Sequence, residues 1–175
     1  MRLNVCLAAL AATLVASPAL AQQAFPTDTA AATARGTVLQ SHSLVNQTAL
    51  DFGIISADPA NPGTVSIEAS AAGLRSFTGG VTLLPSTFQA ARFDGLAAPT
   101  ENVALTLTPP VGNIIQDAAG DTITVNSMSV DSNGLARQAS STGNFTVYVG
   151  GTFGIAANQN SGVYTAQFQL TAEYQ

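Results

Sequence analysis

The sequence predicts an all-β protein made of one immunoglobulin-like Greek-key β-sandwich domain. Apolar residues recur at every second position in many short segments, and Gly, Pro, Asn and Asp separate these segments. No segment carries a convincing apolar stripe at the helical period of about 3.6 residues. Roughly eight to ten short strands in one domain favour a sandwich, and a closed barrel is the alternative.

The internal strands are expected where apolar residues keep one parity: LDFGII at 50–55, TVSIEAS at 64–70, GVTLL at 80–84, VALTLT at 103–108 and NFTVYVGGTFGIA at 144–156. In the last of these the parity continues across Gly150 and Gly151, which indicates one bent strand or two strands meeting at a corner. In TITVNSMSV at 122–130 the parity changes, which predicts a β-bulge near Asn126 and Ser127.

The most regular segment is GVYTAQFQLTAEYQ at 162–175. Its apolar residues alternate with Thr, Gln and Glu throughout: Tyr164, Ala166, Phe168, Leu170, Ala172 and Tyr174. A strict period of two over this length predicts a single long amphipathic strand with one face in the core.

Residues 1–21 have the features of a secretory signal peptide. Arg2 precedes an apolar run, and Ala19-Leu20-Ala21 forms a small-residue cleavage site. The run is short for a membrane span, although an uncleaved anchor is the alternative. We therefore expect a mature chain that begins at Gln22, contains no membrane span and leaves the cytoplasm. Residues 22–34 are expected to form a flexible arm, and residues 35–175 the sandwich domain.

The composition of the expected mature chain narrows the partners and the chemistry. It has no lysine. The one cysteine of the sequence, Cys6, lies in the signal peptide, so the mature chain cannot form an internal disulfide. The formal net charge of −5 becomes −6 without Arg2. An acidic surface without lysine argues against nucleic acid and against a polybasic membrane contact.

Candidate catalytic and metal-binding residues are few. His42 is the one histidine, and a Ser nucleophile needs a base beside it. The carboxylates are scattered, mostly in loops, and the DSNG segment at 131–134 lacks the downstream Glu of a calcium loop. We expect no enzymatic activity, no cofactor and no metal ion.

The C-terminal segment resembles that of chaperone–usher pilus subunits, which carry a Gly fourteen positions from the end and a penultimate Tyr. Gly162 and Tyr174 occupy these positions. Residues 35–175 also resemble an exported proteobacterial family of unknown function, number 4402, and the spore-coat-U-like pilins. The motifs that carry this resemblance are Leu50-Asp51-Phe52-Gly53, Gly63-Thr64-Val65, Thr78-Gly79-Gly80-Val81, Val149-Gly150-Gly151-Thr152 and Gly162-Val163-Tyr164.

The pilin resemblance implies a structural subunit that moves through the periplasm to the cell surface or beyond. Such a subunit lacks its last strand, and a periplasmic chaperone and then the arm of a like subunit fill the resulting groove by strand addition. The residues expected to engage these partners are Gly162, Tyr164, Ala166, Phe168, Leu170 and Tyr174. The arm at 22–34 offers Phe25 beside Pro26 and then mostly Ala and Thr. A self-contained secreted module that binds a glycan or a surface partner is therefore the alternative function.

Overall fold

The computed structural model describes Thr33 and residues 35–175, and Val38–Gln175 forms one compact unit. The predicted signal peptide and most of the predicted arm lie outside the described residues. The described part contains one short 3₁₀ turn, η1 (Val111–Asn113), and twelve strands. The strands are β1 (Ser43–Thr48), β2 (Ile55–Ala57), β3 (Gly63–Ile67), β4 (Arg75–Gly79), β5 (Val81–Leu83), β6 (Ala91–Leu96), β7 (Asn102–Thr108), β8 (Ile114–Gln116), β9 (Thr122–Val130), β10 (Ala136–Gln138), β11 (Asn144–Ile155) and β12 (Gln169–Tyr174).

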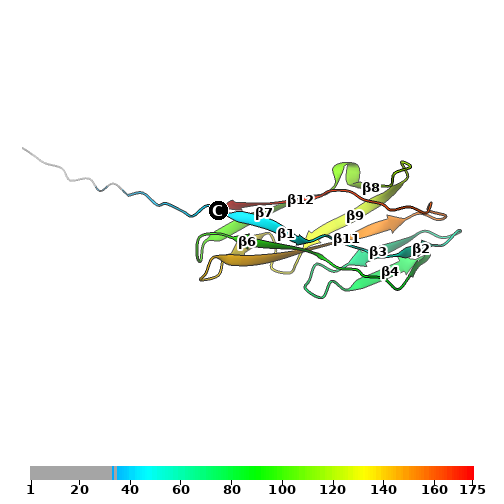
Figure 1. Ribbon diagram of the computed structural model, residues 1–175, viewed down its shortest axis with the longest axis horizontal. Helices are drawn as coiled ribbons and strands as arrows, with labels where there is room; N and C mark the ends of the chain where they lie inside the picture. Colours follow the sequence, from blue (N-terminus) through cyan, green and yellow to red (C-terminus); the bar gives the residue numbers. More distant parts are fainter. Residues whose placement is uncertain (1–32, 34) are drawn as a thin grey trace, which may run out of the picture. The chain divides into compact units, whose positions relative to one another are not determined.

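The strands form two antiparallel layers, and the prediction of an all-β sandwich is confirmed (Figure 1). The larger sheet is built on β11, which pairs with β6, β3 and β9. Strands β1, β4 and β8 extend this sheet beyond β6, β3 and β9 respectively. The smaller sheet has the order β10-β7-β12, and β2 and β5 form a separate two-stranded pair.

Strand β11 runs through both halves of the core as one continuous strand. Its first half pairs with β6 up to Val149, and its second half pairs with β3 from Gly151 onward. A Cβ on Gly150 would lie 2.3 Å from the carbonyl oxygen of Ile67, so the change of neighbour requires glycine. The predicted bulge on β9 is confirmed, because Ser127 pairs with Thr152 and Val125 with Phe153, which leaves Asn126 as the extra residue.

The core consists of two apolar clusters, one at each end of β11. The first cluster lies between β6, β7 and the first half of β11, and includes Ala91, Val103, Val147 and Val149, none of which is measurably exposed. The second cluster lies near β3, β8 and the second half of β11: Phe52, Val65, Ile67, Val81, Ala90, Ile115, Ile123, Val125 and Ile155. The edge of the sandwich is closed beside the first cluster and open beside the second, and the candidate site lies at the open end.

The prediction of one long strand from Gly162 onward is wrong. Only Gln169–Tyr174 forms a continuous ladder, which runs against β7 from Thr108 to Val103. Pro109 and Pro110 follow Thr108 and have no backbone N–H, so β7 cannot continue the ladder past this point. Upstream of Gln169, Thr165 alone pairs with Gln116 of β8.

The prediction of a regular alternating strand over LDFGII is also wrong. Phe52 is buried as expected, but Ile54 is 56% exposed. Gly53 has φ = +71°, a left-handed conformation that turns the chain and ends the alternation. A regular strand begins only at Ile55. Within the described residues, no helix is long and apolar enough to span a membrane.

Candidate partner-binding groove

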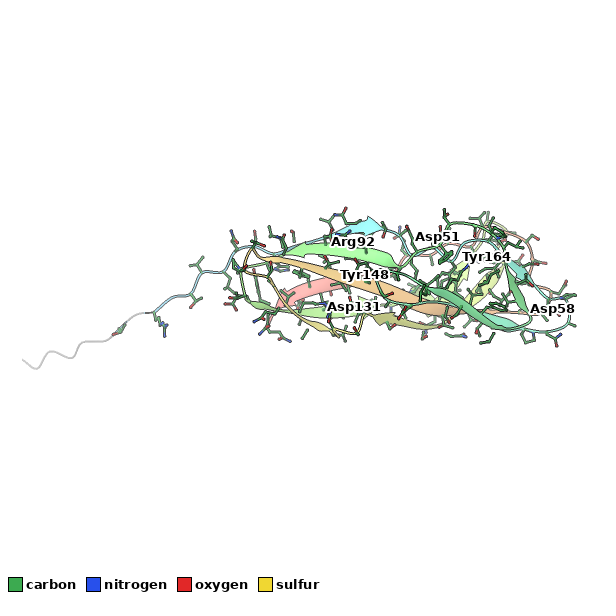
Figure 2. The ribbon with its side chains drawn as sticks, turned by 90° about the horizontal axis from the view of Figure 1, so that it is seen from below. Asp51, Asp58, Arg92, Asp131, Tyr148 and Tyr164 are labelled. Carbon is green, nitrogen blue, oxygen red and sulfur yellow. The ribbon has the colours of Figure 1, made fainter. Side chains whose placement is uncertain are left out.

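An apolar groove of about 980 Å³ opens between two segments that are distant in sequence. One wall is the segment 49–57, which we call the LDFG wall. The other consists of residues 159–166 with Phe168, which we call the C-terminal wall. The floor is formed by side chains of β8, β9 and β11: Ile115, Ile123, Met128, Phe153 and Ile155. Figure 2 shows Asp51 and Tyr164, from opposite walls, toward the end of the domain that carries Asp58.

The C-terminal wall presents one edge of its backbone to the groove. Thr165 exchanges both of its backbone hydrogen bonds with Gln116, at 2.9 and 3.2 Å. Successive residues of an extended chain direct their backbone groups to opposite edges, so those of Tyr164 and Ala166 face away from β8. Among the described residues, neither of these two amides forms a backbone hydrogen bond. The Tyr164 hydroxyl fixes the wall by donating to the Asn160 carbonyl at 2.7 Å.

The LDFG wall has the same character on the opposite side. Asp51 exchanges two backbone hydrogen bonds of 2.9 Å with Gln89, so the backbone groups of Leu50 point to the other edge. Phe52 is buried, and its ring stacks on Phe153 with 3.8 Å between centroids. The groove is therefore an apolar floor between two strand edges, which is the arrangement that one added strand would complete.

The glycine of the LDFG motif is required by its surroundings as well as by its φ angle. A Cβ on Gly53 would lie 2.4 Å from Ser86 Oγ and 2.6 Å from Arg75 Nη1. The Asp51 carboxylate accepts a hydrogen bond of 2.8 Å from the Gly53 amide and so holds the turn. At the end of this wall, the amides of Ala60 and Asn61 donate to the Asp58 carboxylate and lower its pKa below the ordinary value.

At the other end of the sandwich edge, β1 and β12 are joined by Tyr174. Its hydroxyl accepts a hydrogen bond from the Ala98 amide and donates one to the Gln40 carbonyl, both at 2.7 Å. Its ring also lies edge-on against His42, with 5.3 Å between centroids. We call these four residues the tyrosine clasp. The clasp closes the sandwich edge at the end where the described chain enters the domain.

The structure divides the six residues predicted to engage partners into two groups. Tyr164, Ala166 and Phe168 line the groove, and Gly162 lies in the same wall. A Cβ on Gly162 would lie 2.4 Å from Asp117 Oδ2, so this glycine allows close approach to the loop at 117–121. Leu170 and Tyr174 lie outside the groove, where they pack against the first cluster on β12.

Sequence reasoning missed the LDFG wall as part of the site. The signal was present, because Leu50-Asp51-Phe52-Gly53 was one of the family motifs. Its assignment as an ordinary core strand concealed its position beside the groove. Reactive groups do not gather in the groove: His42 belongs to the tyrosine clasp, and the described residues hold no cluster of three or more His, Cys, Asp or Glu side chains.

Comparison with known proteins identifies the family. A model of a domain of unknown function, DUF4402, matches residues 43–174. The chain belongs to this family. The match spans both walls and the floor of the groove as well as the two sheets. Searches of curated proteins and of solved structures returned no match.

Proposed function

We propose that this chain is an exported, non-enzymatic structural subunit of a bacterial surface assembly, joined to like subunits by β-strand addition. The observation that supports this proposal best is the apolar groove between two strand edges. An added strand gains main-chain hydrogen bonds from both walls, and its alternate side chains cover the floor. The resemblance to pilus subunits and the expected signal peptide agree with this function.

The occupant that we propose is the arm of a second copy of this chain. Between residues 29 and 38 small apolar residues occupy one parity: Ala30, Ala32, Ala34, Gly36 and Val38. Thr29, Ala31, Thr33, Arg35 and Thr37 occupy the other, which is polar except at Ala31. This alternation would direct the small residues to the floor and the polar residues to solvent. Val38 is 95% exposed, so this end of the arm is accessible.

To fill its own groove, the chain's arm would have to fold back from the closed end of the sandwich edge. The tyrosine clasp holds Gln40 at the closed end, whereas the LDFG wall begins nine residues further along the chain at Ala49. At about 3.3 Å per residue, an arm that folds back must cover roughly 30 Å before it reaches the groove. Residues 22–39 extend to at most roughly 60 Å, so about half of this length would be used before the arm reaches the groove.

An uncovered groove would be an aggregation hazard, since it exposes both apolar side chains and strand edges. The periplasmic chaperone implied by the pilin resemblance would cover it before assembly. The second function kept open by the sequence, a self-contained secreted binding module, requires that the groove be filled within one chain.

The test compares arm variants of the full chain, exported to a bacterial periplasm and purified. Ala32→Asp with Ala34→Asp places two charges on the parity proposed to face the floor. Thr33→Asp with Thr37→Asp places two charges on the opposite parity and is the matched control. We expect multimers, measured by light scattering after size exclusion, for the wild type and the control, and monomers for the first variant.

A groove variant completes the design. Ile54→Glu introduces a charge into the LDFG wall at a residue that is 56% exposed, and Val45→Glu is its control on β1 at 53% exposed. Ile54→Glu should abolish the multimers and Val45→Glu should not. A thermally stable wild-type monomer would overturn the proposal. If that monomer lost stability with the Ala32→Asp/Ala34→Asp arm, the chain would be filling its own groove, as the self-contained module requires.

A further inference from the structure

The LDFG wall has a gap in its pairing with the neighbouring segment. Asp51 pairs with Gln89, and the Leu84 amide donates to the Ile54 carbonyl beside the β2–β5 pair, but residues 85–88 between these contacts do not continue the ladder. Pro85 lies in this stretch and has no backbone N–H to donate. Carbonyl groups that the backbone ladder leaves without a donor here, such as that of Phe52, need donors from elsewhere.

Arg75 supplies them from β4. Its Nη1 donates to the Phe52 carbonyl at 2.8 Å, and its Nη2 donates to the Leu84 carbonyl at 3.0 Å. Nη1 also lies 3.5 Å from the Ile54 carbonyl oxygen and 3.4 Å from Ser86 Oγ. One planar guanidinium group thus joins the LDFG wall to the segment that follows β5, a geometry that the point charge of lysine cannot reproduce.

The surroundings of Arg75 indicate a positioning role. The ion pairs between described residues are Arg92–Asp94 and Arg137–Asp131, so Arg75 is held by carbonyl dipoles and by the Phe88 ring, 4.6 Å from its centroid. Its Nε is buried and has no hydrogen-bond partner among the described residues. Desolvation of this cation is costly, and its specific hydrogen bonds to the wall offset that cost.

We infer that Arg75 is the positioning residue of the groove. It holds Phe52 and Ile54 in the wall next to Leu50, whose backbone groups face the incoming strand, and it does not contact that strand itself. This inference rests on the proposed function, because a correctly positioned wall is expected to raise the rate at which the groove binds an incoming strand. A preorganised wall spares the incoming strand the cost of ordering it.

The experiment uses the full chain with the Ala32→Asp/Ala34→Asp arm as acceptor, so that its groove stays empty. A fluorescent synthetic peptide of residues 22–39 is the probe, and anisotropy measures its association rate. We expect Arg75→Met to slow association by roughly tenfold, the scale of one charge-assisted hydrogen bond, and Arg75→Lys to slow it less. Arg92→Met, which removes an arginine of β6 outside the groove, should leave the rate unchanged.

Hydrogen exchange of single amides supplies a second readout that needs no partner. Arg75→Met should lower protection at Leu84, which donates to the Ile54 carbonyl at 3.1 Å, and leave the β7–β12 ladder unchanged. Equal peptide association rates in the acceptor with Arg75 and in the acceptor with Arg75→Met would overturn the inference. So would a loss of protection spread evenly over both sheets, since that describes general destabilisation. If the wild-type acceptor bound no peptide, the proposed function would fail, and exchange at Leu84 would still decide the role of Arg75.

Discussion

The two ends of the same sandwich edge are closed in different ways. At one end the tyrosine clasp joins β1 to β12, and the first cluster behind it includes side chains with no measurable exposure. At the other end the LDFG wall and the C-terminal wall diverge around a groove of about 980 Å³, and Ile54 is 56% exposed. One end is a complete sandwich, and the other lacks the side chains of about one strand.

The difference shows that alternation alone does not decide whether a strand is complete. Phe168 and Leu170 follow the same apolar parity as Tyr164, yet Leu170 lies in a paired strand and Tyr164 lies in a wall with one unpaired edge. What separates them is the neighbour. β7 supports the chain up to Thr108, and two prolines end that support where the groove begins.

The largest expected effect is at the complete end, at the buried pair of Asp131 and Arg137. Asp131 Oδ1 accepts a hydrogen bond of 2.6 Å from Arg137 Nη2, and Oδ2 accepts one of 2.9 Å from the Tyr148 amide. Asp131→Ala would leave the guanidinium buried without its partner, and should lower the free energy of unfolding by about 3–5 kcal/mol. Urea denaturation measures this loss.

The double variant Asp131→Ala with Arg137→Met should recover part of the stability, because no unpaired charge remains. Peptide binding by the folded fraction should not change in either variant. A loss below about 1 kcal/mol for Asp131→Ala would mean that the pair is far more hydrated than its exposures of 6% and 9% indicate.

The next effect is at the open end. Gly53→Ala should lower the free energy of unfolding by about 2–3 kcal/mol, through the positive φ and the contacts of the new Cβ with Ser86 and Arg75. It should also weaken strand binding, because the LDFG wall is displaced. Gly134→Ala is the matched control, since Gly134 has φ = +78° and nothing within 4 Å of an added Cβ. Equal losses in the two variants would show that close packing at Gly53 contributes nothing.

Tyr174→Phe should have a smaller effect, of about 1–2 kcal/mol, because the buried Ala98 amide loses its acceptor. Hydrogen exchange should increase at Ala98, while the groove keeps its affinity for the peptide. Tyr148→Phe is the control, as the Tyr148 hydroxyl forms no hydrogen bond with a described residue and its loss should be nearly neutral. Loss of peptide binding in Tyr174→Phe would show that the two ends are coupled.

The smallest effect concerns Asp58, which is partly exposed at the open end. Its lowered pKa stabilises the folded state above the pKa of the unfolded chain, about 3.9, and this contribution is lost as pH falls through the folded pKa. Asp58→Asn should therefore be slightly less stable than wild type at pH 7, and the difference should vanish in strong acid. Thermal midpoints across the acid range measure it. A difference that grew as pH fell would contradict the sign.

The sequence predicted the sandwich because apolar and polar residues alternate clearly along most of its strands. Val65, Val103 and Val147 are buried as the alternation requires, and the bulge at Asn126 follows from a change of parity within one strand. Strands with mixed parity gave a weaker local signal: β1 has exposed Val45, and Phe77 of β4 is 51% exposed at a sheet edge. Their pairing depends on neighbours that local patterns do not reveal.

The groove was predictable on one side only. Tyr164, Ala166 and Phe168 followed from the alternation and from the pilin resemblance. The LDFG wall required the left-handed Gly53, and Arg75 required a contact with Phe52 across 23 residues of sequence. The pairing that brings these residues together is long-range, so no window of the sequence contains it.

The distribution of arginines has a practical consequence for handling the protein. Trypsin cuts after Lys and Arg, and the mature chain expected here has no Lys. Arg75, Arg92 and Arg137 are held in β-strands by their hydrogen bonds, whereas Arg35 is exposed ahead of the domain. Cleavage concentrates at such extended, exposed segments, so limited digestion should remove the arm in a single cut. The same peptide bond, once seated in the groove of a neighbouring copy, would resist the protease, and the rate of that one cut would report how many arms are engaged.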